Sequence, residues 1–252
     1  MLATERQTKI IEALGDSMFV SVEDLAKRLD VSAMTIRRDL DMLDRTGRLS
    51  RCHGGAVRMG VIREEEAYSE KRVCNLEAKR RIARACARLV APGDIVYLDA
   101  GTTTYEIAAE IRDIGNLTVV TNDLAIAGAL LGSAATLIAI GGVVQKETGS
   151  MIGRFAEDML ARLRATVAFI GTSSVDANFN LTSPTVEKSA IKNTAIEIAE
   201  RAYLVADGSK FYKTALVKVV GLSRFAGVIT DKAFSREEAG ILGDMGIEAI
   251  HV

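Results

Sequence analysis

The sequence predicts a chain of two parts: a small, mainly helical domain in residues 1–58 and a larger α/β domain in residues 76–252, with a linker at 59–75. Two observations predict this division. Three segments of helical periodicity and a hairpin signal fill the first part, whereas short apolar runs alternate with helical segments from residue 77 onwards. Because strands that alternate with helices form parallel sheets, we expect a mostly parallel sheet with helices on both faces.

Composition limits the class of protein. Of the 252 residues, 48% are hydrophobic and 26% are charged, which is typical of a globular protein with a sizeable core. The net charge of −1 gives no overall attraction for nucleic acid, so any such binding has to come from a local basic patch. The N-terminus has no apolar signal segment and no run of about 18 apolar residues occurs, so we expect a cytoplasmic protein outside the membrane.

The numbers and spacing of the cysteines and histidines do not predict a metal site or a redox centre. The three cysteines have no CxxC spacing, which indicates a reducing compartment without a disulfide framework. Only His53 and His251 are available to join them as ligands, so we expect no metal site. Neither a Walker loop nor a dinucleotide fingerprint occurs, and we expect no cofactor.

Three helices are expected in the first domain. The first spans residues 4–14, and Gly15 should end it. Ser21 is placed to cap the second helix and Ser32 to cap the third, which should end at Gly47. Two short helices joined by a turn of three or four residues have helix-turn-helix spacing, in which the second helix of the pair enters the major groove of DNA.

The third helix has two different faces. Its apolar residues recur at i, i+4 and i+7: Ile36, Leu40 and Leu43. Roughly opposite lie Met34, Thr35 and Arg38, with Arg37 on the flank. Such a helix packs on its own domain and presents hydroxyl and guanidinium groups to an anion. Taken by itself, the pattern is equally typical of an ordinary amphipathic surface helix.

A basic hairpin is expected after this helix. Residues 49–51 and 56–58 can pair around the glycines at 54 and 55, which tolerate the positive φ of a tight turn. Between residues 45 and 58 the chain has no acidic residue and four arginines: Arg45, Arg48, Arg51 and Arg58. Cations without competing carboxylates favour phosphate contacts, so the domain is predicted to be a winged helix-turn-helix that binds DNA. The alternative is a solvated basic hairpin without a partner.

The first domain also resembles a known family. The run EDLAKRLDVSAMTIRRDLDMLDRTGRLSRCHGGA is similar to the signature of the DeoR family of bacterial transcriptional repressors. The resemblance implies that four residues of the third helix lie at the DNA: Ser32, Thr35, Arg37 and Arg38. It places Arg51 and His53 in the wing, where the charge pattern also puts Arg48. Residues 59–75 lack an apolar period and are expected to be a linker, partly helical, with a dimer-forming arm as the alternative.

The larger domain alternates between strands and helices. Strands are expected at 95–98, 117–120, 136–140, 166–170, 203–206, 227–229 and 248–250. Helices are expected between them at 78–89, 105–111, 124–131, 155–163, 189–199 and 236–242. Ligands of such sheets bind beyond the carboxyl ends of the strands.

Polar and glycine residues gather at those strand ends. Asp99, Gly101, Thr102, Thr103 and Thr104 follow the first strand and open a helix, which is a pattern suited to phosphate. The next strands are followed by Thr121 and Asn122, Gly141 and Gly142, Gly171 and Thr172, and then Asp207, Ser209 and Lys210. A single such turn is most often plain helix capping. Together the five predict a crevice with a phosphate cradle, carboxylates for sugar hydroxyls and a lysine that balances charge.

The DeoR resemblance extends over this domain through the segments LDAGTTT, LTVVTNDLAIA, AFIGTSSVD and DGSKF. It implies a fold similar to ribose-5-phosphate isomerase and a phosphorylated sugar as ligand. The implied phosphate contacts are Gly101, Thr102, Thr103 and Thr104. The implied sugar contacts are Asp99, Thr121, Asn122, Gly142, Gly171 and Lys210. The sequence departs from the family at one place. Members commonly have a glutamate four residues before the lysine that corresponds to Lys192, whereas Lys188 stands there in this chain and Glu187 lies one residue further back. Whether Glu187 and Lys192 contact the ligand is therefore left open.

These observations predict a repressor of a carbohydrate catabolic operon, released from its operator by a phosphorylated sugar or a related intermediate. Its partners would be double-stranded operator DNA, the sugar phosphate and further copies of itself, as a dimer or tetramer, because one helix reads too few base pairs. We expect no catalytic residues. The alternative is a sugar-phosphate isomerase fused to a DNA-binding module, in which Asp99, Asp207 and Lys210 transfer protons. Activation of transcription instead of repression is a third possibility.

Overall fold

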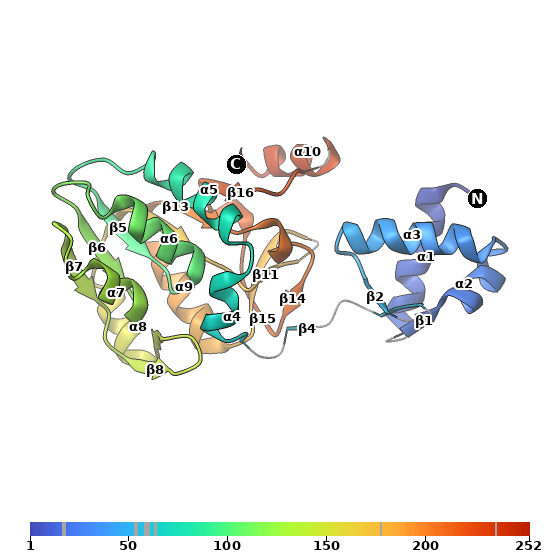
Figure 1. The fold of residues 1–252 in the computed structure, drawn as a ribbon, viewed down its shortest axis with the longest axis horizontal. Helices are drawn as coiled ribbons and strands as arrows, with labels where there is room; N and C mark the ends of the chain where they lie inside the picture. Colours follow the sequence, from blue (N-terminus) through green and yellow to red (C-terminus); the bar gives the residue numbers. More distant parts are fainter. Residues whose placement is uncertain (17–18, 53–54, 58–60, 63–64, 177, 235) are drawn as a thin grey trace.

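A computed structural model of the chain describes residues 1–16, 19–52, 55–57, 61–62, 65–176, 178–234 and 236–252. They form a small lobe and a large lobe, with the chain crossing from one to the other once (Figure 1). The small lobe contains α1 (Ala3–Asp16), β1 (Phe19–Ser21), α2 (Val22–Leu29), α3 (Ala33–Arg45), β2 (Ser50–Cys52) and β3 (Gly55–Val57). Its three strands form an antiparallel sheet in the order β1-β3-β2.

Capping residues set the helix-turn-helix. The Ser21 hydroxyl accepts a hydrogen bond from the backbone N–H of Asp24 at 2.9 Å, and the Ser32 hydroxyl accepts one from Thr35 at 3.1 Å. Asp30, with φ of 51°, ends α2 in the left-handed conformation and turns the chain toward α3. The predicted end of the first helix at Gly15 is wrong, because α1 continues to Asp16. A glycine within a helix lowers the stability of the helix by only about 1 kcal/mol relative to alanine, so a helix can continue past it.

The rear face of α3 builds the core of the small lobe. Ile36 and Leu40 are fully buried and Leu43 is 1% exposed, as the i, i+4, i+7 spacing predicts. Beside them the guanidinium of Arg6 in α1 pairs with the carboxylate of Asp39 in α3, and the second bond of this fork, from Nη2 to Oδ1, is 3.1 Å long. The pair ties α1 to the helix whose other face is open to solvent.

We expect Asp39→Ala to destabilise the small lobe by about 2 kcal/mol, because Arg6 would keep its charge in a buried position without a partner. Urea titration followed by far-UV circular dichroism measures the change. Asp41→Ala in the same helix is the matched control: its partner Arg51 is solvent-accessible, so its loss should leave the midpoint nearly unchanged. Equal midpoint shifts in the two variants would contradict the assignment of a buried stabilising pair.

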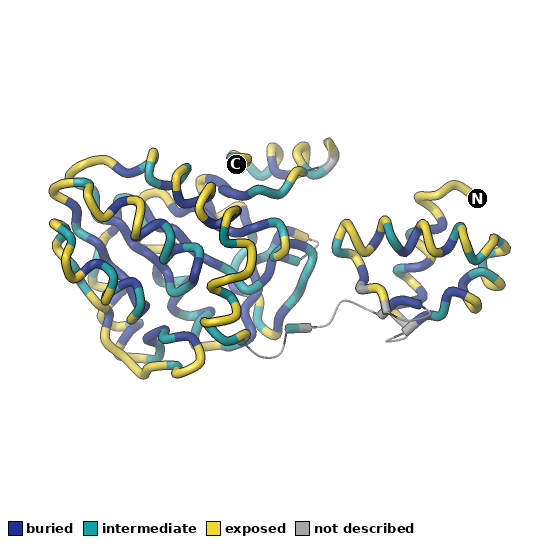
Figure 2. Tube along the Cα trace, in the orientation of Figure 1, coloured by how far each residue is buried: buried dark blue, intermediate teal, exposed yellow. Residues whose placement is uncertain are grey.

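A seven-stranded parallel sheet forms the centre of the large lobe, in the order β17-β16-β13-β10-β5-β6-β7. The strands are β5 (Ile95–Leu98), β6 (Thr118–Thr121), β7 (Thr136–Ala139), β10 (Ala165–Ile170), β13 (Ala199–Val205), β16 (Gly227–Thr230) and β17 (Glu248–His251). Each lies within a few residues of its predicted position, and the fold class is confirmed. Figure 2 shows the central strands as the most buried part of the lobe.

Helices cover both faces of this sheet. They are α5 (Leu76–Ala87), α6 (Thr102–Ile111), α7 (Leu124–Leu130), α8 (Arg154–Leu160), α9 (Val186–Ile198) and α10 (Arg236–Asp244). The first three pack in one apolar cluster with alternate residues of the strands, such as Val167 and Phe169. The last three pack in the other cluster with the residues between, such as Ala168 and Ile170. No helix in the described residues is both long and apolar enough to cross a membrane.

Several small elements were not predicted. They are a hairpin of β8 (Val143–Gln145) and β9 (Ser150–Ile152), a sheet of β11 (Ser174–Val175), β12 (Asn180–Ser183) and β15 (Val217–Gly221), and two short 3₁₀ turns at Gly208–Lys210 and Leu222–Arg224. These strands have two to five residues, which is too short for a periodicity to show in the sequence. One of these small elements, the turn Gly208–Lys210, contributes Lys210 to the pocket described below.

The connector between the lobes packs on the large lobe. Its strand β4 (Val61–Ile62) pairs in parallel with β14 (Thr214–Ala215), and its helix α4 (Tyr68–Val73) follows. The N–H of Tyr68 donates to the carbonyl of Glu147 in the turn between β8 and β9, at 3.0 Å. The expected partly helical linker is therefore also part of the large lobe's surface; the predicted boundaries at 58 and 76 remain a prediction.

Candidate functional site

A pocket of about 750 Å³, including space open to solvent, lies at the carboxyl end of the central sheet. The chain continues from β5 to β6 and β7 on one side, whereas β10, β13, β16 and β17 extend the sheet on the other. The pocket therefore sits where the strand order reverses, which is the usual ligand site of open parallel sheets. Its walls come from the loops after β5, β10 and β13, from helices α5 and α9, and from the connector.

The loop after β5 forms a cradle at the start of α6. Thr102, Thr103 and Thr104 occupy the first turn of this helix, whose N–H groups have no partner within the helix. Two side chains that follow β6 fix this loop. The N–H of Gly101 donates to the Asp123 carboxylate at 3.0 Å, and the N–H of Ala100 donates to the side-chain oxygen of Asn122 at 3.0 Å. A helix N-terminus fixed in this way favours an anion such as phosphate.

A buried ion pair closes the base of the pocket. The ammonium of Lys192 in α9 pairs with the carboxylate of Asp99 and donates to the carbonyl of Gly171 at 2.8 Å. The same carboxylate accepts the N–H of Gly171 at 3.1 Å. Both charged side chains are less than 8% exposed. The pair joins the loops after β5 and β10 to α9, so its first role is to fix the shape of the pocket.

The lining is strongly cationic. It includes two glutamates, Glu65 and Glu66, and six lysines: Lys71, Lys79, Lys188, Lys192, Lys210 and Lys213. Six lysines against these two glutamates and Asp99, which pairs with Lys192 at the base of the pocket, leave a surplus of three positive charges. Burial lowers the pKa of Lys79 and of Lys188 from the ordinary lysine value, and in Lys188 the nearby Glu65 opposes this effect. A surplus of buried ammonium groups predicts an anionic ligand.

Six predicted effector contacts line this pocket: Gly101, Thr102, Thr103, Thr104, Gly171 and Lys210. Asp99 and Asn122 line a small adjoining cavity beneath the cradle. The two other predicted contacts, Thr121 and Gly142, line neither the pocket nor this cavity. Thr121 is fully buried and its hydroxyl donates to the carbonyl of Leu98 at 2.8 Å. A Cβ on Gly142 would lie 2.6 Å from the carbonyl oxygen of Ile152, so close packing requires glycine there.

The two positions left open by the sequence have different locations. Lys192 lines the pocket, whereas Glu187 is exposed and is absent from its lining. Lys188, at the place of the family's glutamate, faces the pocket with Lys192 one helical turn away. This i, i+4 pair of lysines was a signal that sequence reasoning missed. Glu65 and Glu66 gave no signal, because only the path of the connector brings them to the pocket.

The polar face of α3 is open to solvent. Met34 is 60% exposed, and Ser32, Arg37 and Arg38 are exposed, while Thr35 is partly covered. Arg48 is also exposed. Arg51 forms an ion pair with Asp41 of α3, which orients the base of the wing. His53 lies outside the described residues, so its predicted role in the wing stays a prediction.

One loop contacts both lobes. Lys210 and Lys213 line the pocket, and Tyr212 between them lies against Gly47, directly after α3. A Cβ on Gly47 would lie 2.7 Å from the Cβ of Tyr212, and Gly47 has φ of +67°, so this contact requires glycine. One short segment, residues 210–213, thus lines the pocket and also contacts Gly47 after α3. In the described residues, no group of three or more potential metal-ligating side chains occurs.

Comparisons with known proteins agree with this geometry. The family described as "DeoR-like helix-turn-helix domain" matches residues 6–60, and the family described as "DeoR C terminal sensor domain" matches residues 74–232. The chain is 36% identical to "HTH-type transcriptional regulator GlpR" of Haloferax volcanii over 99% of both chains. It is 31% identical to the "Glycerol-3-phosphate regulon repressor" of Escherichia coli over 92% of both.

Solved structures resemble the chain at low sequence identity and low TM-score. A D-ribose-5-phosphate isomerase in complex with phospho-erythronic acid covers 54% of each chain with a TM-score of 0.40 and 15% identity. The full-length sorbitol operon regulator SorC of Klebsiella pneumoniae covers 94% of this chain and 98% of its own, with a TM-score of 0.41 and 15% identity.

A winged helix-turn-helix joined to an α/β sensor domain defines a class of transcriptional regulators. Within that class, the chain belongs to the DeoR family.

Proposed function

We propose that this protein represses a carbohydrate catabolic operon and leaves its operator when a phosphorylated sugar or a related intermediate fills the pocket. The observation that carries the proposal is the occurrence, in one chain, of an exposed polar face on α3 and a lysine-lined pocket at the N-terminus of α6. The name of the Escherichia coli relative, a glycerol-3-phosphate regulon repressor, points to a small phosphorylated carbohydrate. Such a regulator acts in the cytoplasm, where operator and metabolite meet.

The repressor is proposed to act as a dimer or tetramer, because a single α3 reads too few base pairs for specificity in a genome. Exposed apolar side chains on neighbouring elements support self-association. Phe155 at the start of α8 is 82% exposed, and Val143 and Val144 of β8 are 66% and 41% exposed. An apolar patch of this kind is typical of an interface. Sedimentation equilibrium of the purified chain measures the assembly.

Catalysis is the less favoured alternative. Proton transfer needs a carboxylate that is free to meet the substrate, and Asp99 is bound by Lys192 and by the N–H of Gly171. Asp207 is equally occupied, since it accepts hydrogen bonds from the Asn75 amide at 2.8 Å and the Ser209 N–H at 3.0 Å. We therefore expect saturable binding of sugar phosphates without turnover.

The test begins with selection of the operator from random DNA duplexes by the full-length protein. Each member of a panel of sugar phosphates is then added, and operator affinity is measured by fluorescence anisotropy. One compound should weaken operator binding at least tenfold, and saturating operator should weaken the binding of that compound by the same factor, because linkage is reciprocal. Equal affinity of the compound for free and DNA-bound protein rules out the switch, and release of isomerised product favours the enzyme.

A further inference from the structure

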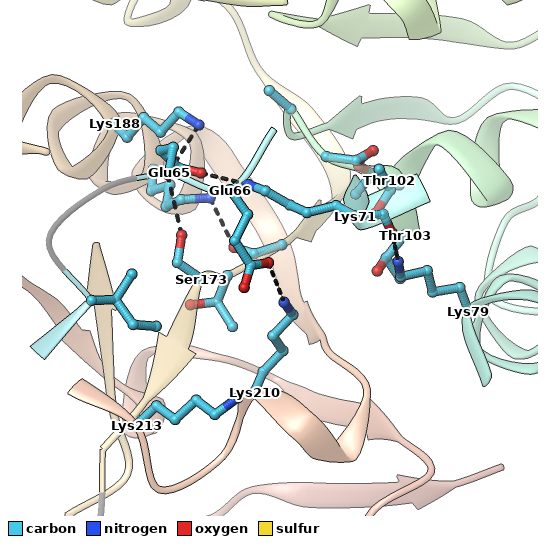
Figure 3. Close-up of a pocket in the computed structure, with 17 residues that line it drawn as sticks. Glu65, Glu66, Lys71, Lys79, Thr102, Thr103, Ser173, Lys188, Lys210 and Lys213 are labelled. Atoms are coloured by element: carbon cyan, nitrogen blue, oxygen red, sulfur yellow. Dashed lines mark hydrogen bonds and ion pairs between the residues drawn. The ribbon is translucent and has the colours of Figure 1, made fainter. Parts of the chain in front are cut away.

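The pocket already contains an anion that the protein supplies itself. Glu65, in the connector between β4 and α4, extends into the pocket between Lys188 and Lys71 (Figure 3). Its carboxylate lies 3.1 Å from the Lys188 ammonium and 2.5 Å from that of Lys71, and it accepts the hydroxyl of Ser173 at 3.2 Å. The Glu65 side chain is 4% exposed, although the connector carries it over the surface of the lobe.

This carboxylate is firmly ionised. Burial alone would raise the pKa of Glu65, but the charges of Lys188 and Lys71 outweigh burial and lower the pKa to about 2. The side chains of Lys188 and Lys71 are 12% and 20% exposed, so without Glu65 two poorly solvated ammonium groups would face each other. Two such ammonium groups favour an anion at this place.

The other half of the pocket lacks such an anion. The first turn of α6, with Thr102 to Thr104, lines this part of the pocket, and Lys210 and Lys213 line the same pocket. The second glutamate of the lining, Glu66, lies 4.0 Å from Lys210 and has a side chain that is 67% exposed (Figure 3). No ion pair of Lys213 occurs in the described part of the chain. The two halves thus offer two anion sites, and the protein fills one of them.

We propose that the effector has two anionic groups, one held by the cradle of α6 and the other replacing the Glu65 carboxylate between Lys71 and Lys188. This inference rests on the proposed function and names the chemical class of its ligand: a sugar bisphosphate or a phosphorylated sugar acid. A neutral hydroxyl cannot take the place of Glu65, because the two lysines would lose their counter-charge. A monophosphate fills the cradle first and leaves the connector in place until its concentration is high enough for a second copy to compete with Glu65.

Displacement of Glu65 also gives the ligand a route to the DNA-binding lobe. Glu65 follows β4 closely, and β4 pairs with β14, which begins directly after Lys213. Once Glu65 leaves the lysines, the strongest polar tie between this part of the connector and the pocket is lost. The second anionic group binds Lys71 and Lys188 only after Glu65 has left them. The ligand therefore favours the state in which the connector is released from the pocket, and such a difference in affinity between two states is what a switch needs.

The test counts anion sites with inorganic phosphate, which needs no knowledge of the sugar. Isothermal titration of the full-length wild type should give one phosphate per chain. Glu65→Gln keeps the size of the side chain and removes its charge, so it should give two phosphates per chain, or at least tenfold tighter total binding. Glu70→Gln, which removes an exposed charge of α4 outside the pocket lining, is the matched control and should match the wild type in phosphate stoichiometry.

Hydrogen exchange supplies a second measurement on the wild type. Saturating phosphate should raise exchange in the peptide 65–73, where the N–H of Tyr68 bonds to Glu147, because a second phosphate competes with Glu65 at high concentration. One phosphate or none in both wild type and Glu65→Gln overturns the proposal, as does unchanged exchange. Operator release is measured separately: if no sugar phosphate releases the operator while the phosphate counts are as expected, the proposed function fails and the second anion site stands.

Discussion

Replacing Thr102 by aspartate should abolish the response to effector and leave a repressor that stays on its operator. Thr102 lines the pocket at the first position of α6, so the new carboxylate would stand where the phosphate is expected. Two unit charges about 4 Å apart repel by about 4 kcal/mol at an effective dielectric constant of 20. We expect effector affinity to fall at least 100-fold, measured by titration calorimetry, with operator affinity unchanged by fluorescence anisotropy.

The control for this variant is Thr102→Val, which has the same shape and no charge. It should keep effector affinity within a few-fold of the wild type, since the cradle's main donors are backbone N–H groups. An aspartate in the first turn of a helix is favourable to the helix dipole, so Thr102→Asp should fold normally. If Thr102→Asp retains wild-type effector affinity, the phosphate does not bind at the start of α6.

Much of this architecture could be predicted because its signals are local. The strands of the central sheet are short apolar runs, and their parallel direction follows from their alternation with helices. The cradle was predictable for the same reason, since Gly101 and the threonines after it follow β5 directly in the chain. Polar residues at the carboxyl ends of parallel strands meet at one edge of the sheet. This rule can be applied without knowing which distant segments of the chain pack together.

The parts that could not be predicted depend on packing between distant segments. Glu65 belongs to a stretch without apolar period, and only the pairing of β4 with β14 brings it to the lysines of the pocket. Gly142 has the composition of a ligand turn, yet it serves the close approach of β9. Thr121 lies at a strand end and its hydroxyl faces back to Leu98. Strand-end position predicts the neighbourhood of a side chain, but not the direction in which it points.

The shared loop gives the two lobes a second mechanical link besides the connector. Lys210 and Lys213 face the pocket, and Tyr212 between them packs on Gly47 at the end of α3. A ligand that draws both lysines toward its phosphate acts on the backbone that carries Tyr212. Under the proposed function the N-terminal end of α3 faces DNA, and a shift at its C-terminal end would change the angle at which the helix meets the groove.

Arg38→Ala should weaken operator binding at least tenfold and leave effector affinity intact. Arg38 is exposed on the face of α3 opposite the buried Ile36, Leu40 and Leu43, where nothing in the described small lobe requires it. An arginine contact to a base or phosphate contributes about 1–3 kcal/mol, and in a symmetric dimer the loss occurs at both half-sites. Fluorescence anisotropy with the selected operator measures this loss, and calorimetry measures effector affinity.

The salt dependence of the same variant identifies the contact. If Arg38 neutralises a phosphate, the slope of log affinity against log salt should decrease by about 1 for each copy of the helix, with little change in sequence preference. If it reads a base edge, the slope should stay nearly constant and discrimination at one operator position should relax. Arg112→Ala, an exposed arginine of the large lobe, is the matched control and should bind operator as the wild type does. Unchanged operator affinity in Arg38→Ala would show that a different face of α3 meets the DNA.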